Sequence, residues 1–268
     1  MENNKNLKML RSFRFYMPQA MKFYNLKKEY LTPLTFILAL ILYSVGALLL
    51  SSFLTKSNID LNEIASYLST RNMDLADLQS FLSDMYAFYG TNLLINFVRD
   101  TALGIVSAMF LFAFIKELKA ETYTLKSSLV IVLKKTPVII FASIVFTLGY
   151  TLGLQFLIIP GAIVYCVFLF NLCFVLDGDQ GLISAFQSSM ILTKGNRMQL
   201  FSILFFFKLS TFLLLSFLVS LFNSSNNNLL IMIVNAFLSA VVYLMETKLL
   251  ASMYVDLVYG WKAIIVEK

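Results

Sequence analysis

The chain of 268 residues is 59% apolar and only 13% charged, and its mean hydropathy is +0.79. Soluble domains of this length have about a quarter charged residues, so the composition excludes a water-soluble globule and indicates an integral membrane protein. The formal net charge of +6 does not indicate nucleic-acid binding, because no soluble segment gathers basic and aromatic residues.

The residue types also exclude several kinds of chemistry. The sequence has no histidine, so neither a His-rich zinc site nor a Ser-His-Asp triad can be built. Cys166 and Cys173 are about 10 Å apart along one predicted helix, too far for a disulfide, and are interpreted as buried apolar residues. No polar segment contains a Gly-rich phosphate loop or a metal-ligand cluster. We therefore expect a protein without cofactor or metal that is not an enzyme.

The chain begins with a basic segment, residues 1–30, and then reaches its first predicted span at residues 34–54. A span needs about 20 apolar residues, and Thr32 and Pro33 fit the N-cap and the first helical position. The apolar stretch is too long and starts too late for a cleaved signal peptide, so we expect it to remain as an anchor.

Residues 56–90 form a polar outer loop with two predicted amphipathic helices. Apolar residues at helical spacing follow Asp60 and Asp74, each an acidic start of the kind that caps helices. They are Leu61, Ile64 and Leu68 in the first helix, and Leu78, Phe81, Leu82 and Met85 in the second. We expect these helices to cover the outer mouth of the bundle as a structural cap, with a ligand-binding lid as the alternative.

Five more spans follow, so the sequence predicts an all-α bundle of six transmembrane helices within one membrane domain, residues 1–268. They cover about residues 92–114, 137–155, a stretch after the following turn that ends near residue 176, 200–222 and 229–251. Pro160-Gly161 marks the turn between the third and the fourth, and the polar residues 223–228 separate the last two.

Basic residues are distributed asymmetrically about these spans. Sixteen lysines and arginines fall on the side of the N-terminus, and two, Lys56 and Arg71, fall in the opposite loops. The positive-inside rule then places both termini in the cytoplasm, in a multi-pass protein of the plasma membrane.

Three basic amphipathic segments, here called elbows, precede the first, third and fifth spans. Their apolar positions are Met17, Met21 and Tyr24; then Leu125, Leu129, Val132 and Leu133; then Ile183, Phe186 and Met190. Such helices lie in the membrane interface with lysines toward anionic headgroups, so membrane lipids are the expected partners. Gly195 fits the position after the end of the third elbow. The chain is thus interpreted as three elbow-plus-hairpin units, in which the elbows either sense lipid or merely connect spans.

One stretch resembles a known family. Ile159-Pro160-Gly161, an apolar span, Asp177-Gly178-Asp179-Gln180-Gly181, Ala185, Ser188, Ser189 and Lys194-Gly195-Asn196 form a signature of about forty residues. It is similar to YciC-like bacterial inner-membrane proteins and to the membrane domain fused to some glycerophosphodiester phosphodiesterases. The resemblance implies a multi-span bacterial membrane protein without an established activity. This sequence lacks the phosphodiesterase domain, so that activity does not carry over.

Ionisable residues inside predicted spans are functional hypotheses by default, because a charge at membrane depth costs at least ~2.5 kcal/mol. The candidate intramembrane polar network is Lys208, Glu246, Asp100, Arg99, Asn235, Ser239 and Tyr243. We expect Lys208 to pair with Glu246 or with Asp100, and we expect the neighbours Arg99 and Asp100 to point in different directions.

The network has three interpretations. It is a structural ion pair with hydrogen bonds between helices, a polar path for a small solute or ion, or a lysine that snorkels without an interior partner. We prefer the first, and with it a non-catalytic bacterial plasma-membrane protein, envelope- or lipid-related or part of a membrane assembly. The alternative is a small transporter, or a transporter membrane subunit, that uses Lys208 and Glu246.

Overall fold

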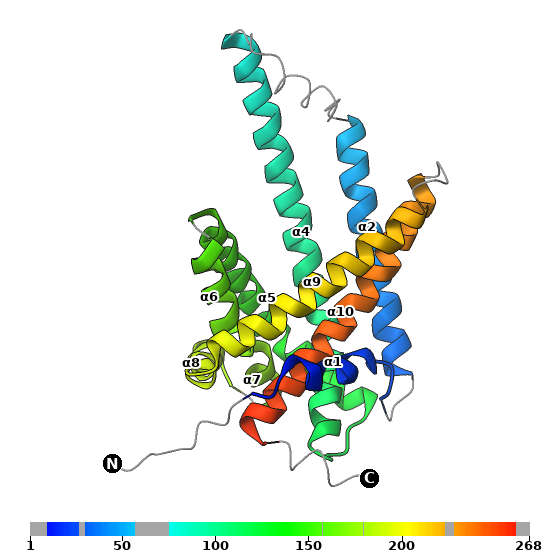
Figure 1. Ribbon diagram of the computed structural model, residues 1–268. Helices are drawn as coiled ribbons and strands as arrows, with labels where there is room; N and C mark the ends of the chain where they lie inside the picture. The colour runs from blue at the N-terminus through cyan, green and yellow to red at the C-terminus, as the bar shows by residue number, and fades with distance from the viewer. Residues whose placement is uncertain are drawn as a thin grey trace.

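The computed structural model describes residues 10–26, 30–56, 75–156, 158–178, 180–222 and 228–260, and all regular secondary structure in these ranges is helical (Figure 1). In chain order the helices are α1 (Phe13–Met21), α2 (Leu31–Lys56), α4 (Leu75–Leu118), α5 (Leu125–Phe156), α6 (Ile158–Phe168), α7 (Asn171–Asp177), α8 (Leu182–Thr193), α9 (Arg197–Phe222) and α10 (Asn228–Val258). The predicted all-α class is therefore confirmed.

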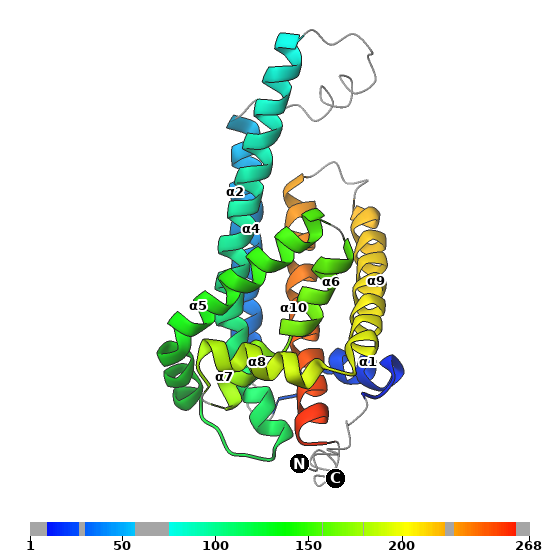
Figure 2. The ribbon, with the colours of Figure 1, turned by 90° about the vertical axis from the view of Figure 1, so that its left-hand side faces the viewer.

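Five of the helices, α2, α4, α5, α9 and α10, are long and apolar enough to cross a membrane. Three antiparallel hairpins, α2–α4, α5–α6 and α9–α10, meet at one end of the bundle, where α1, α7 and α8 also lie (Figures 1 and 2). We call this the basic end, because the charged ends of α4 and α5 lie there. Its core contains the fully buried rings of Tyr16, Phe110 and Tyr254.

The second outer helix does not exist as a separate element. Residues 75–90 continue into the second span as the single 44-residue helix α4, because the chain offers no proline there, and Gly90 alone does not end the helix. Figure 1 shows that this part of α4 projects past the tips of the other two hairpins instead of folding over them. The prediction of a cap formed by this helix is therefore wrong, and the helix predicted behind Asp60 lies outside the described residues.

The elbow before the third span is also not a separate helix. Residues 125–156 form one helix, α5, that runs through Pro137. The hydroxyl of Thr136 donates to the carbonyl of Val132 at 2.8 Å, whereas Pro137 has no N–H to donate to the carbonyl of Leu133. Leu129 and Val132 pack against the protein core, whereas Leu133 is exposed. The predicted apolar face therefore mainly covers protein.

The fourth predicted span is broken into α6 and α7 at Leu169–Phe170. The buried side chain of Ser189 on α8 satisfies the break, because its hydroxyl donates to the carbonyl of Val167 at 2.8 Å and accepts from the amide of Phe170 at 3.2 Å. Backbone groups freed inside a membrane protein need such partners. This bond gives Ser189, a residue of the sequence signature, a structural role.

The other two elbows fall on α1 and α8. Helix α8 buries Ala185, Ser189 and Thr193, and its exposed side carries Ile183 and Met190. Helix α1 buries Tyr16 and Ala20 and contacts α10, while Met21 is exposed. How these helices lie in a membrane stays a prediction.

Three smaller sequence predictions were also tested by the structure. Gly195 has φ of +92° directly after the end of α8, which confirms it as the left-handed residue there. Thr32 lies inside α2, which begins at Leu31, so its predicted role as N-cap is wrong. Cys166 and Cys173 are both buried and unpaired, as predicted.

Candidate functional site

Glu246 is the centre of a polar contact between three helices. Lys208 of α9 donates to its Oε2 at 2.6 Å, and the Tyr165 hydroxyl of α6 donates to its Oε1 at 2.8 Å. Each carboxylate oxygen therefore has one donor from a different helix. Lysine pairing with Glu246 is the first of the two arrangements predicted from the sequence.

The two charged side chains differ in exposure. The side chain of Glu246 is 14% exposed and that of Lys208 is 52% exposed. Because the Lys208 side chain is half exposed, its stem lies at the surface of the helix bundle, while its ammonium group reaches inward to the carboxylate. Helix α9 itself has the length and composition of a membrane span. The pairing differs from the snorkelling alternative, in which the lysine has no interior partner.

Arg99 and Asp100 pair with each other, at 2.9 Å between Nη2 and Oδ1. The sequence did not predict this pairing, which forms because the long arginine side chain reaches the adjacent carboxylate although the two side chains differ in exposure, 27% for Arg99 and 50% for Asp100. Its guanidinium also lies 5.3 Å from the centre of the Tyr43 ring on α2. A Cβ at Gly46 would lie 3.2 Å from Arg99 Cδ, so glycine permits this close contact between α2 and α4.

The other candidate residues of α10 differ in their contacts. Tyr243 packs edge-on against Tyr43, with 6.4 Å between ring centres. Asn235 is exposed and Ser239 partly exposed, and neither bonds to a charged side chain of the described chain. The structure thus brings Lys208 and Glu246 together, pairs Arg99 with Asp100, and leaves Asn235 and Ser239 outside these contacts.

A second polar centre lies at the basic end around Asp177, the last residue of α7. Its Oδ1 accepts from Lys119 Nζ at 3.0 Å, and its Oδ2 accepts from the hydroxyls of Tyr254 at 3.0 Å and Tyr259 at 2.5 Å. We call these four residues the Asp177 cluster. Only 1% of the Asp177 side chain is exposed. The negative end of the α7 dipole disfavours a carboxylate here, so these donors are needed to stabilise it.

Glu121 joins the cluster from outside through Lys119 at 2.8 Å, and it also pairs with Lys116. Burial by itself lowers the pKa of Lys119, but hydrogen bonds with Glu121, Asp177 and Tyr259 outweigh it and raise the pKa above its usual value. Hydrogen bonds from Lys116 and Lys119 lower the pKa of the Glu121 carboxyl. Burial, and then the bond to Asp177, raise the pKa of Tyr259, which therefore remains a donor.

Two further contacts attach the N-terminal segment to α10. The buried Tyr16 hydroxyl donates to Asp256 at 2.5 Å. The buried Lys248 donates to the carbonyl of Lys22, and its ammonium lies 4.5 Å from the centre of the Phe114 ring. Both contacts are consistent with docking of α1 onto the core.

The sequence reasoning missed Tyr165 and the Asp177 cluster. A tyrosine in an apolar span carries no signal that separates a hydrogen-bond donor from an ordinary core ring. Asp177 stood in the family signature, but its partner Lys119 is 58 residues away, and charges at the ends of spans are common. Among the described residues, no three carboxylate or thiol side chains gather as metal ligands would.

Comparisons of the chain with protein-family models, with curated proteins and with solved structures give no match.

Proposed function

We propose that the chain is a non-catalytic protein of a bacterial plasma membrane, envelope- or lipid-related, that crosses the membrane six times with both termini in the cytoplasm. Five crossings are the long apolar helices, and α6 with α7 makes the remaining one. The signature shared with YciC-like proteins supports the bacterial membrane, and the sixteen-to-two basic asymmetry supports the orientation.

The observation that carries the non-catalytic part is the closed contact among Lys208, Glu246 and Tyr165. Both oxygens of the carboxylate are occupied by donors of the protein itself. An acid, base or nucleophile must instead present a group to a substrate. We therefore assign the contact to holding α6, α9 and α10 together.

The pair is tested by a double-mutant cycle on the free energy of unfolding in detergent. Lys208→Met and Glu246→Gln each strand a charged partner. Breaking a fully buried pair costs about 3–5 kcal/mol, and we expect each single variant to lose less than this because the Lys208 side chain is half exposed. The double variant leaves no unpaired charge, so we expect it to recover most of that loss. The control Lys194→Met, at an exposed position, should leave stability unchanged.

Two outcomes contradict a structural pair. If the single variants are as stable as the parent chain, Lys208 contributes nothing by pairing. If the double variant is as unstable as the singles, the two residues act independently.

A small transporter is the second candidate, supported by two observations. The Lys208 side chain is half exposed although it lies within a span, and the helix that supplies Tyr165 is followed by a break of the kind that transporters use at binding sites. The double variant distinguishes the two candidates. A structural pair predicts that it is stable and complements a strain lacking the gene, whereas a transport role predicts that it is stable but fails to complement.

A further inference from the structure

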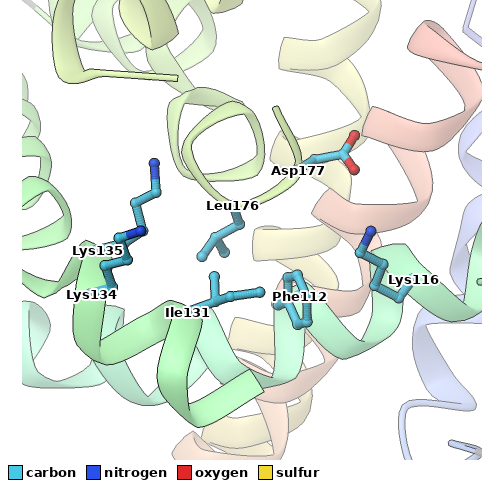
Figure 3. A pocket seen from close by; sticks show the side chains of 7 residues that line it. All are labelled: Phe112, Lys116, Ile131, Lys134, Lys135, Leu176 and Asp177. Carbon is cyan, nitrogen blue, oxygen red and sulfur yellow. The ribbon is translucent and has the colours of Figure 1, made fainter. Parts of the chain in front are cut away.

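A pocket of about 330 Å³ opens at the basic end between α4, α5 and α7. Figure 3 shows Lys134 and Lys135 of α5 on one side, Lys116 of α4 on the other, and the apolar side chains between them. Phe112, Ile131 and Leu176 form this apolar part, and Asp177 completes the lining. Cationic groups around an apolar floor fit a ligand that is anionic at one end and apolar at the other.

The pocket is positively charged because its one carboxylate is already neutralised. Asp177 is 1% exposed, bonds to Lys119 and two tyrosine hydroxyls, and points away from the α5 lysines in Figure 3. Lys116 pairs with Glu121, which also contacts Lys119. Lys134 of α5, which is exposed, therefore adds positive charge beyond these pairs.

The position of the pocket along the helices selects the kind of ligand. Lys116 follows the apolar run of α4 that ends at Ile115, and Lys134 and Lys135 directly precede the third span predicted from the sequence, residues 137–155. The lysines therefore mark the level where span residues give way to polar ones, which is the level of lipid headgroups. Basic pockets between transmembrane helices at this level suit anionic headgroups.

We propose that this pocket binds the phosphate of an anionic phospholipid, with the lysines on the phosphate and the acyl chains continuing along α4 and α5. The volume suits a phosphoglycerol group rather than a whole lipid. The inference rests on the proposed function in placing the basic end at the headgroups of the membrane.

The test compares the purified full-length chain in a non-ionic detergent with the variant Lys134→Gln/Lys135→Gln. Dioctanoyl phosphatidylglycerol is titrated, and its affinity is read from the rise in thermal stability. Each lysine near a phosphate contributes about 1 kcal/mol, so the double variant should bind about 10- to 30-fold more weakly. The matched control Lys126→Gln/Lys194→Gln removes two exposed lysines of the basic end that do not line the pocket, and it should keep the parent affinity.

Several outcomes overturn the proposal. They are equal affinity of the parent chain and the Lys134→Gln/Lys135→Gln variant, equal weakening in the control, and equal stabilisation by dioctanoyl phosphatidylcholine. Competition by glycerol 3-phosphate at the concentration of the lipid would show a site for free phosphate instead. If the double variant unfolds without lipid, the single exposed substitution Lys134→Gln decides, with an expected weakening of about 5-fold. Failure here leaves the Lys208–Glu246 cycle untouched, because that cycle is measured without added lipid.

Discussion

Glu246 and Asp177 are two carboxylates held in the same way in two different surroundings. Each accepts from one lysine, and Glu246 accepts from one tyrosine hydroxyl and Asp177 from two. Their lysines differ, since Lys208 is 52% exposed within a span whereas Lys119 is 17% exposed at the end of one. Asp177 is enclosed by three donors, whereas Glu246 has two donors, of which the charged one is half exposed.

The largest effect should come from Asp177→Asn. Breaking a buried pair costs about 3–5 kcal/mol, and we expect a loss near the lower limit because Lys119 keeps Glu121 as a partner. Unfolding in detergent measures the loss. The matched change Glu121→Gln removes a carboxylate that bonds to the same lysine but is 39% exposed, so it should cost only about 0–1 kcal/mol. Equal losses would remove the distinction between the enclosed carboxylate and its exposed neighbour.

A smaller effect is expected from Tyr165→Phe, which removes the bond to Glu246 Oε1 but keeps the ring. Hydrogen bonds between helices in membranes contribute about 0.6–1.7 kcal/mol. The loss should vanish in the Glu246→Gln background if the hydroxyl acts through that carboxylate. Tyr86→Phe, at an exposed position on α4, serves as the control and should have no effect.

The smallest change concerns pH. The raised pKa of Lys119 means that its stabilising contribution is complete below its unfolded value of about 10.4 and is lost as the pH rises through the folded value. The stability difference between the parent chain and Lys119→Met should therefore be constant from pH 6 to pH 9 and shrink only above about pH 10.4. A difference that shrinks already between pH 6 and pH 9 would contradict the bonds assigned to Lys119.

Sequence reasoning found Glu246 and Lys208 because a charge inside an apolar run is costly and therefore conspicuous. It did not find the Asp177 cluster, since nothing in the spacing of Asp177, Lys119 and Tyr259 shows that a turn and two helix ends converge. The same limit explains Asn235 and Ser239, which share a helical face with Glu246 but lie outside its contacts. Periodicity gives the face of a helix, while its partners depend on packing between helices.

For the fold, the lengths of the apolar runs predicted the five long helices. They did not predict where a helix continues and where it breaks. Hydropathy changes at residue 90 and near Pro137, yet α4 and α5 pass through both places. Conversely, the fourth predicted span is one uninterrupted apolar run in the sequence, yet its helix is broken at Leu169–Phe170. There the hydroxyl of Ser189, on another helix, makes a break tolerable.

The orientation of the basic end is the claim on which the functional proposal depends most directly. Single cysteines at Gln79, on the projecting part of α4, and at Lys194, after α8, occupy exposed positions at opposite ends of the bundle. A membrane-impermeant maleimide applied to intact cells should label Gln79→Cys and not Lys194→Cys, while permeabilised cells should label both. The parent chain is the control and should not react, because Cys166 and Cys173 are buried. Labelling of Lys194→Cys in intact cells would place the basic end outside and contradict the account.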